Sequence, residues 1–306
     1  YSPKLDCFQL TCSDVERAII ALKTKWTPTS EGLSSRIAKD MAKFLAAVLT
    51  PLFNRSLSDG IFPDLLKSAI LVPVFKGGVQ TQINNYRPIA LLMTISKIFE
   101  KSVKEKLLNY LDLINFFSEK QFGFIRNKST DIALFTHITN ITDGIEKNNI
   151  SAGVYLDLAK AFDTVNHKLL IKKLDNIGIQ GPLLGWFTTY LHERNHCVKI
   201  NDTLSSQLKM EHGVPQGSVL GPLLFNIYIN ELFSLPLRAK IMGYADDTSL
   251  LYSSASADEI NADFQHDQKI ITPWFRSHLL HLNINKCVGI IYSFKDTEKG
   301  RKACQV

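Results

Sequence analysis

Two adjacent carboxylates, Asp246 and Asp247, end a Tyr-Ala-Asp-Asp tetrapeptide that is flanked by apolar runs at 239–243 and 248–252. This pattern predicts a β-hairpin with both acids at its tip. Neighbouring negative charges repel one another, which costs free energy unless a cation lies between them. Because carboxylate oxygens are the ligands that Mg²⁺ prefers, the pair predicts a magnesium site and a third carboxylate on a neighbouring strand.

Asp157 is the candidate for that third carboxylate. It lies near the end of an apolar run at 152–158, and short apolar runs are typical of buried strands. Three carboxylates from two adjacent strands can hold two metal ions about 3.5–4 Å apart, which clamp the attacking and leaving oxygens of an in-line phosphoryl transfer. Taken singly, these signals leave alternatives open: an Asp-Asp dipeptide is usually a solvated turn, and Asp157 alone could cap a helix.

Several blocks of the sequence resemble, in their order and approximate spacing, the motifs of reverse transcriptases from non-LTR (LINE-type) retrotransposons, and in particular their jockey-like branch. The two catalytic motifs match YLDLAKAFDTV at 155–165 and YADD at 244–247. The other matches are NYRPI at 85–89, SKIFEK at 96–101, QFGF at 121–124 followed by Ser129 and Thr130, GVPQGSVLGPLLF at 213–225, and LNINK at 282–286. Each block alone is a weak signal, whereas their order over about residues 15–295 is specific.

The resemblance implies an α+β fold with the fingers and palm of a right-hand polymerase, in which an antiparallel palm sheet packs on helices. It implies an N-terminal helical extension at 1–60 and a reverse transcriptase domain, truncated before the thumb, at 61–306. The family's thumb and endonuclease have no counterpart in the sequence, which begins with Tyr1. The chain is therefore expected to belong to a longer retrotransposon polyprotein.

The implied activity is RNA-directed DNA polymerisation by nucleotidyl transfer, in which the 3′-hydroxyl of a DNA primer attacks the α-phosphate of a dNTP paired to an RNA template. Two Mg²⁺ ions, or Mn²⁺ in their place, would be held by Asp157, Asp246 and Asp247. Tyr244, which opens the tetrapeptide, is expected to contact substrate. Lys286 is expected to protonate the leaving pyrophosphate, and general-acid help of this kind contributes about 10²–10⁴ in rate.

The resemblance also implies which residues contact the nucleotide and the nucleic acid. Lys76 and Arg87 would grip the triphosphate, and the planar guanidinium of arginine suits phosphate oxygens. Phe162 would act as the steric gate that rejects a 2′-hydroxyl, the group that distinguishes ribonucleotides from deoxyribonucleotides. Gln216 and Gly217 would contact template or primer, because glycine lets a backbone approach closely.

Composition agrees with this interpretation without deciding it. The chain has 306 residues, 45% of them hydrophobic, and a net charge of +6, which suits a nucleic-acid partner but is modest. The five cysteines form no Cys-x-x-Cys pair, which argues against a zinc knuckle and favours a reducing compartment. The sequence lacks an apolar run of about 18 residues, so no membrane span is expected. The predicted location is intracellular, in cytoplasm and nucleus.

Local patterns predict the elements that carry these motifs. SDVE at 13–16 is expected to form a capping box at the start of a helix. A strand at 69–75 and the segment from Tyr86 are expected to form a hairpin, and Asp163 is expected to cap the helix after the first catalytic motif. A further helix is predicted from apolar residues at helical spacing, all expected in the core: Ile37, Met41, Phe44, Leu45 and Val48.

Two other functional classes stay open. One is a decayed reverse transcriptase that acts only as a nucleic-acid-binding fold, because the thumb that holds the duplex is missing from the sequence. The other is an RNA-templated RNA polymerase of similar shape, against which Phe162 argues. Alanine at Asp246 separates a scaffold from an enzyme, and alanine at Phe162 tests the sugar gate.

Overall fold

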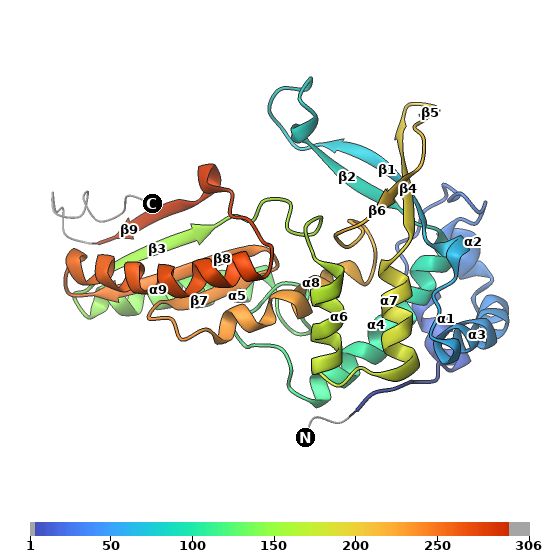
Figure 1. Cartoon of the computed structure of the whole chain (residues 1–306), viewed down its shortest axis with the longest axis horizontal. Coiled ribbons are helices and arrows are strands. Elements are labelled where there is room, and N and C mark those ends of the chain that lie inside the picture. Colours follow the sequence, from blue (N-terminus) through green and yellow to red (C-terminus); the bar gives the residue numbers. More distant parts are fainter. Residues whose placement is uncertain (1–3, 294–306) are drawn as a thin grey trace. The chain divides into compact units, whose positions relative to one another are not determined.

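The computed structural model describes residues 4–293, which fold as two units that share the chain in alternation (Figure 1). The first unit is formed by the described residues up to Phe116 together with Asn166–Leu224. The second unit is formed by Phe117–Val165 together with the described residues from Phe225 onward. The end of the predicted polymerase domain, beyond residue 293, lies outside the described residues.

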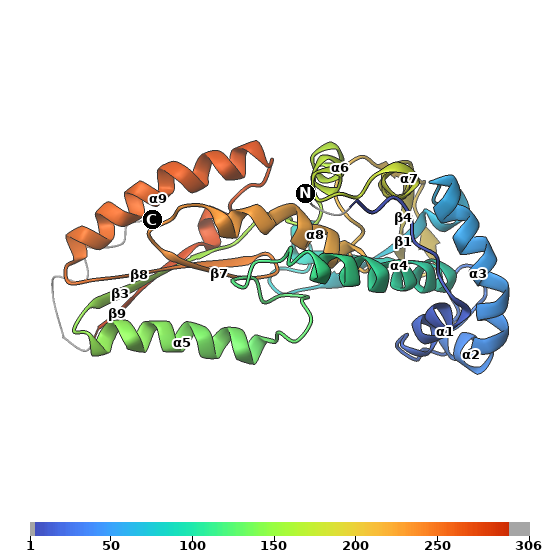
Figure 2. The same ribbon diagram turned by 90° about the horizontal axis from the view of Figure 1, so that it is seen from below.

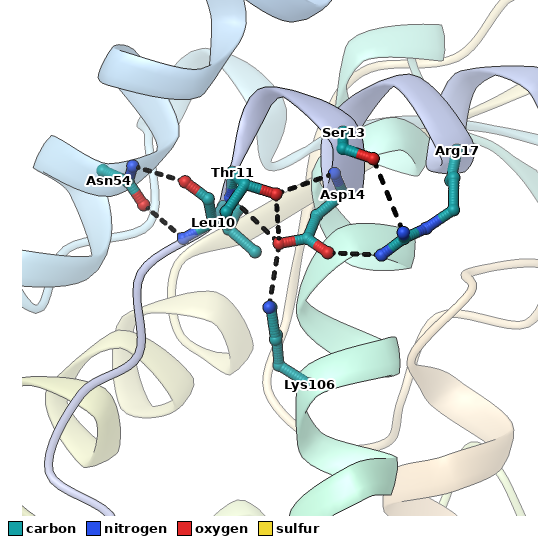
Figure 3. Close-up of polar contacts among 7 residues, drawn as sticks. All are labelled: Leu10, Thr11, Ser13, Asp14, Arg17, Asn54 and Lys106. Carbon is teal, nitrogen blue, oxygen red and sulfur yellow. Dashed lines mark hydrogen bonds and ion pairs between the residues drawn. The ribbon is translucent and has the colours of Figure 1, made fainter.

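Helix α1 (Cys12–Ile20) begins with a capping box, but upstream of the predicted one (Figure 3). Thr11 Oγ1 accepts a hydrogen bond from the Asp14 amide at 3.1 Å, and Asp14 Oδ2 accepts one from the Thr11 amide at 2.9 Å. The cap predicted at Ser13 was wrong because Thr11 offers a hydroxyl too, and it has the extended backbone that an N-cap requires. Asp14 also pairs with Lys106 Nζ at 2.8 Å. Burial opposes the charge of Asp14, but the bonds from Lys106 and Thr11 outweigh it and lower its pKa.

Helices α2 (Ser35–Asp40) and α3 (Ala42–Asp59) bury a face that differs from the predicted one. Ile37, Met41 and Phe44 are exposed, as is Val48, while Leu45 is half-buried. The prediction was wrong because apolar residues occupy more than one face of these helices, and helical spacing alone cannot select between them. The buried face consists largely of small residues and two larger ones: Ala38, Ala42, Ala46, Leu49 and Phe53.

The sheet of the first unit contains the predicted hairpin. β1 (Ser68–Phe75) pairs antiparallel with β2 (Tyr86–Leu91), with Phe75 opposite Tyr86. β1 also pairs in parallel with β4 (Arg194–Ile200), which in turn pairs antiparallel with the short strands β5 (Thr203–Leu204) and β6 (Leu208–Met210). The loop between β1 and β2 is therefore held at its base by a regular ladder.

Helices α4 (Thr94–Leu113), α6 (His167–Asn176) and α7 (Gly181–Leu191) complete the first unit. The N-cap of α6 is Asn166, whose Oδ1 accepts a bond from the Leu169 amide at 3.0 Å, so the prediction of a cap at Asp163 was wrong. The core is aromatic, with ring centroids between 4.1 and 5.9 Å apart. Its rings belong to Phe53, Phe62, Phe99, Trp186 and Tyr190.

In the described part of the second unit, strands pair antiparallel in the order β7-β8-β3-β9. They are β3 (Ile150–Leu156), β7 (Lys240–Tyr244), β8 (Asp247–Ser254) and β9 (Val288–Tyr292). Figure 2 shows α9 (Ala257–Ser277) on one face of this sheet and α5 (Thr130–Glu146) on the other. Because both faces of β3 are covered, its residues form a nearly continuous apolar run.

The remaining elements are short. They are α8 (Gly221–Ile229) and the 3-10 turns η1 (Asp64–Leu66), η2 (Ile83–Asn85), η3 (Asn230–Ser234) and η4 (Ile284–Lys286). Helices and mainly antiparallel sheets therefore make this an α+β protein. No helix within residues 4–293 combines the length and apolar character needed to cross a membrane.

Candidate active site

The Tyr-Ala-Asp-Asp tetrapeptide forms the predicted hairpin tip. Tyr244 ends β7 and lies opposite Asp247, which begins β8, so Ala245 and Asp246 form a two-residue loop. The φ angle of Ala245 is +58°, in the left-handed region. The favoured two-residue hairpin loops have positive φ at their first position, where glycine, asparagine or aspartate is typical. Alanine at this position is strained, so contacts from outside the loop must hold the turn.

Asp157 is held beside this tip, as the sequence predicted. The last register pair between β3 and β8 joins Leu156 to Thr248, so Asp157 follows β3 next to the start of β8. The carbonyl of Asp157 accepts a bond from the Asn283 amide at 2.8 Å. This bond fixes the backbone at the position from which the Asp157 carboxylate extends.

Lys286 comes to the same place from η4. Its Nζ lies 3.6 Å from Asp157 Oδ2, and its side chain is 61% exposed while that of Asp157 is 31% exposed. An ion pair so open to water contributes little to stability. The pair matters instead for placement, because it holds an exposed ammonium group next to the Asp157 carboxylate.

The charges of Asp157 and Asp247 are held close together. The protein around Asp247 and the negative charge of Asp157 raise the pKa of Asp247, and the charge of Lys286 opposes this rise. Asp246 is half-buried in the turn. Within residues 4–293, no three His, Cys, Asp or Glu side chains already converge as a metal site. The fit to a hard cation therefore rests on the oxygen donors and on the mutual repulsion of Asp157 and Asp247.

A cavity of about 410 Å³ opens beside these residues in the second unit. Asp157, Asp247 and Lys286 line one part of it, and residues of α5 line another. His137 Nε2 and the Tyr155 hydroxyl are 2.6 Å apart in its wall. Burial lowers the pKa of His137, and burial together with the Tyr292 hydroxyl raises the pKa of Tyr155. Both groups are therefore neutral at pH 7, and the negative charge of the cavity comes from the carboxylates.

Phe162 lies in the turns that follow Asp157. Its ring is half-buried and packs against Phe225, with centroids 4.7 Å apart and an angle of 31° between the planes. Phe225 is fully buried, so it holds one side of the Phe162 ring in place.

The other predicted nucleotide contacts belong to the first unit. Lys76 and Arg87 are exposed on the β1–β2 hairpin, and the Lys76 amide closes its loop by donating to the Asn85 carbonyl at 2.9 Å. Arg87 lies opposite Val74 in the ladder. Both cations are thus presented by a regular hairpin.

Gln216 and Gly217 are joined to the same hairpin. The Gln216 carbonyl accepts a bond from the Ala90 amide of β2 at 2.7 Å. Gly217 has φ +111°, and a Cβ there would lie 2.7 Å from the Ala90 carbonyl oxygen. Only glycine permits both this conformation and this approach. The first unit therefore links the four predicted nucleotide-contacting residues through β2.

Glu100, to which its motif block assigned no role of its own, holds the loop that contains Gln216. It is fully buried on α4, and its Oε2 accepts bonds from the Val219 and Leu220 amides at 2.7 and 3.1 Å. Burial raises the pKa of Glu100, and the charge of the buried Arg194 opposes this rise. Its position within the SKIFEK block at 96–101, directly after the apolar Phe99, was the signal that could have identified it.

The segment that contains Gln121 lies along β7 of the β7–β8 hairpin. The Phe122 amide donates to the Gly243 carbonyl at 2.8 Å, and the Gly243 amide donates to the Lys120 carbonyl at 2.9 Å. A Cβ on Gly243 would lie 2.4 Å from the Phe233 ring. β7 is therefore enclosed closely on the side opposite β8.

Comparison with known proteins agrees with this geometry. The family model described as "Reverse transcriptase (RNA-dependent DNA polymerase)" matches residues 75–300. The chain is 28% identical, over 92% of its length, to the "Probable RNA-directed DNA polymerase from transposon BS" of Drosophila melanogaster. It is 28% identical, over 93% of its length, to the "RNA-directed DNA polymerase from mobile element jockey" of the same organism. The chain spans 32% of the length of each of these two relatives.

Proposed function

Because the chain belongs to the reverse transcriptase (RNA-dependent DNA polymerase) family, we propose that its carboxylate site performs RNA-directed DNA synthesis. The observation that carries this proposal is the placement of Asp157 beside Asp247 on adjacent antiparallel strands. Members of this family generally use divalent metal ions. The proposed substrates are an RNA template, a DNA primer and dNTPs, in the cytoplasm and nucleus.

We propose that Asp157, Asp246 and Asp247 hold two Mg²⁺ ions, which Mn²⁺ can replace. When bound, the ions would supply Lewis-acid activation of the primer 3′-hydroxyl and stabilise charge on the leaving pyrophosphate. Burial and the negative charge of Asp157 together raise the pKa of Asp247, and a bound cation would offset the negative charge of both carboxylates.

The chain's own residues would then position the reactants. Lys286, at 3.6 Å from Asp157, is free to swing on its exposed stem toward a pyrophosphate and give it a proton. Tyr244 lines the cavity beside the acids and would contact substrate there. Lys76 and Arg87 would bind the triphosphate oxygens. Gln216 and Gly217 would let template or primer approach their backbone.

The same proposal assigns parts of the fold. The sheet β7-β8-β3-β9 with α5 and α9 would be the palm, and the β1–β2 hairpin would belong to the fingers. Residues 1–60 would be an N-terminal extension of a domain at 61–306. A thumb, an endonuclease and other parts of a longer polyprotein would act with this chain, whose relatives are about three times its length.

Primer extension on poly(rA)/oligo(dT) with Mg²⁺ tests the proposed function. We expect DNA synthesis by the wild-type chain and a loss of about 10³-fold or more in Asp246→Ala, because a metal ligand that neutralises transition-state charge is removed. Asp143→Ala, at an exposed acid of α5, is the matched control and should remain active. Extension by Asp246→Ala at the wild-type rate would exclude this site. Binding of RNA without any extension by the wild type would favour the decayed fold.

The proposed sugar gate predicts a change in nucleotide choice. Phe162→Ala should raise incorporation of ribonucleotides relative to deoxyribonucleotides by about 10- to 100-fold, because the ring would no longer occupy the space of a 2′-hydroxyl. Competing dGTP and GTP on a poly(rC) template measures this ratio. Phe135→Ala, which removes an exposed ring from α5, should leave the ratio unchanged. A wild-type chain that already accepts ribonucleotides equally well would instead indicate an RNA polymerase.

A further inference from the structure

The tip of the catalytic hairpin is held in a backbone conformation that its own sequence disfavours. Ala245 has φ +58° and is 5% exposed, and Asp246 and Asp247 follow it directly. An L-residue with a Cβ avoids the left-handed region, so an alanine turn relaxes to other shapes unless its neighbours forbid them. Any such relaxation would redirect both carboxylates.

The side chain of Gln121 binds both polar backbone groups of Ala245. Its Oε1 accepts from the Ala245 amide at 3.0 Å, and its Nε2 donates to the Ala245 carbonyl at 3.2 Å. The same Oε1 accepts from the Gly123 amide at 2.8 Å. Gln121 is 1% exposed, so these bonds form away from water, where leaving a partner unsatisfied is costly.

The backbone around Gln121 is shaped for this contact. A Cβ at Gly123 would lie 2.2 Å from the Ala245 nitrogen, so only glycine allows the segment to come this close. Gln121 also forms a parallel bridge with Gly243, which ties the segment to β7 just before the tip. The backbone of Gln121 is therefore held in place, and its side-chain amide lies where it can bond Ala245.

We propose that Gln121 is a positioning residue that holds the left-handed turn at Ala245 and thereby aims Asp246 and Asp247. It reaches the reacting groups only through the backbone of Ala245. The catalytic consequence rests on the proposed function, whereas the holding of the turn does not.

Gln121→Met removes every hydrogen bond of this side chain at similar size and tests the proposal. In ¹⁵N-alanine-labelled protein, we expect amide exchange at Ala245 to accelerate about tenfold or more. In primer extension, we expect kcat to fall about 10- to 100-fold while KM for dNTP changes little. Gln265→Met, at an exposed glutamine of α9, should match the wild type in both measurements.

Rescue distinguishes positioning from general support of the core. Glycine adopts positive φ freely, so adding Ala245→Gly to Gln121→Met should recover about fivefold of the lost kcat. If the methionine variant does not fold, Gln121→Glu replaces it. Glutamate keeps the acceptor but presents an oxygen to the Ala245 carbonyl, and it should also accelerate exchange.

Unchanged exchange at Ala245 in a folded Gln121 variant would overturn the proposal, as would an unchanged kcat or a double variant no more active than the single one. A wild-type chain that extends no primer would instead overturn the proposed function. In that case the exchange rate of Ala245 still decides whether Gln121 holds the turn.

Discussion

Replacing Asp157 by asparagine is expected to lower the rate of primer extension by about 10³-fold or more. It should not lower the stability of the metal-free protein. The amide keeps the size of the carboxyl group but loses the charge that a metal ion requires. In the folded chain, that charge also repels Asp247 and helps to raise its pKa. The substitution therefore removes a proposed metal ligand and a source of repulsion together.

The pH dependence of stability gives this prediction a sign. Folding raises the pKa of Asp247. The stability that this group contributes to the folded protein is therefore fully present below the unfolded-state pKa of about 3.9. It is lost as the pH rises through the folded-state pKa. In Asp157→Asn the pKa of Asp247 rises less, so less stability is lost as the pH increases. The free energy of unfolding of the variant should therefore increase relative to that of the wild type between about pH 4 and pH 7.

Urea unfolding at pH 4 and pH 7, with and without Mg²⁺, measures these effects. We expect the variant to equal or slightly exceed the wild type at pH 7 in the absence of metal, since the exposed pair that it loses with Lys286 is worth only about 0–1 kcal/mol. Mg²⁺ should stabilise the wild type more than the variant. Asp143→Asn, at an exposed acid, is the control. A large loss of stability in Asp157→Asn would show that Asp157 is structural.

Glu100→Ala is expected to destabilise the protein by about 3–5 kcal/mol, enough to unfold much of a marginally stable chain. Truncation leaves the charge of Arg194 buried without its counter-charge and removes the acceptor of the Val219 and Leu220 amides. Those amides follow Gln216 and Gly217, so the loop proposed to contact nucleic acid would lose its anchor.

Chemical denaturation measures the free energy of unfolding of Glu100→Ala. The control is Glu105→Ala, which truncates an exposed glutamate on the same helix and should lower the free energy of unfolding by less than about 0.5 kcal/mol. Glu100→Gln, which keeps one acceptor oxygen but not the charge, should fall between the two. Equal stability of Glu100→Ala and Glu105→Ala would mean that Arg194 and the loop do not depend on Glu100.

The sequence predicted the β7–β8 hairpin and the neighbouring strand β3 because the apolar runs that indicate them are local. Apolar runs define β3, β7 and β8, whereas paired acids at a hairpin tip indicate a cation only together with the motif blocks that surround them. Asp157 could then be placed next to Asp247 because a third carboxylate is needed to complete such a site. The metal-binding roles of Asp157, Asp246 and Asp247 remain predictions.

Other features escaped because nothing local encodes them. Thr11 and Ser13 both offer a capping hydroxyl, and the folded chain uses Thr11, which has an extended backbone and bonds reciprocally with Asp14. The apolar residues of α2 and α3 do not reveal which face other helices cover. Glu100 and Gln121 lie in recognised motif blocks, but each bonds backbone groups more than a hundred positions away, so the role of its side chain is not visible until the chain is folded.

The alternation of the chain between the two units also sets the order in which they can form. β1 must wait for its parallel partner β4, which starts at residue 194, and at about 5–20 residues per second this delay lasts roughly 6–25 s during synthesis. β3 emerges during that time, while its partners β8 and β9 have not yet been made. An apolar strand with two unpaired edges is then exposed on the nascent chain. The buried strand that leads to Asp157 therefore needs protection from aggregation until β8 and β9 have been made.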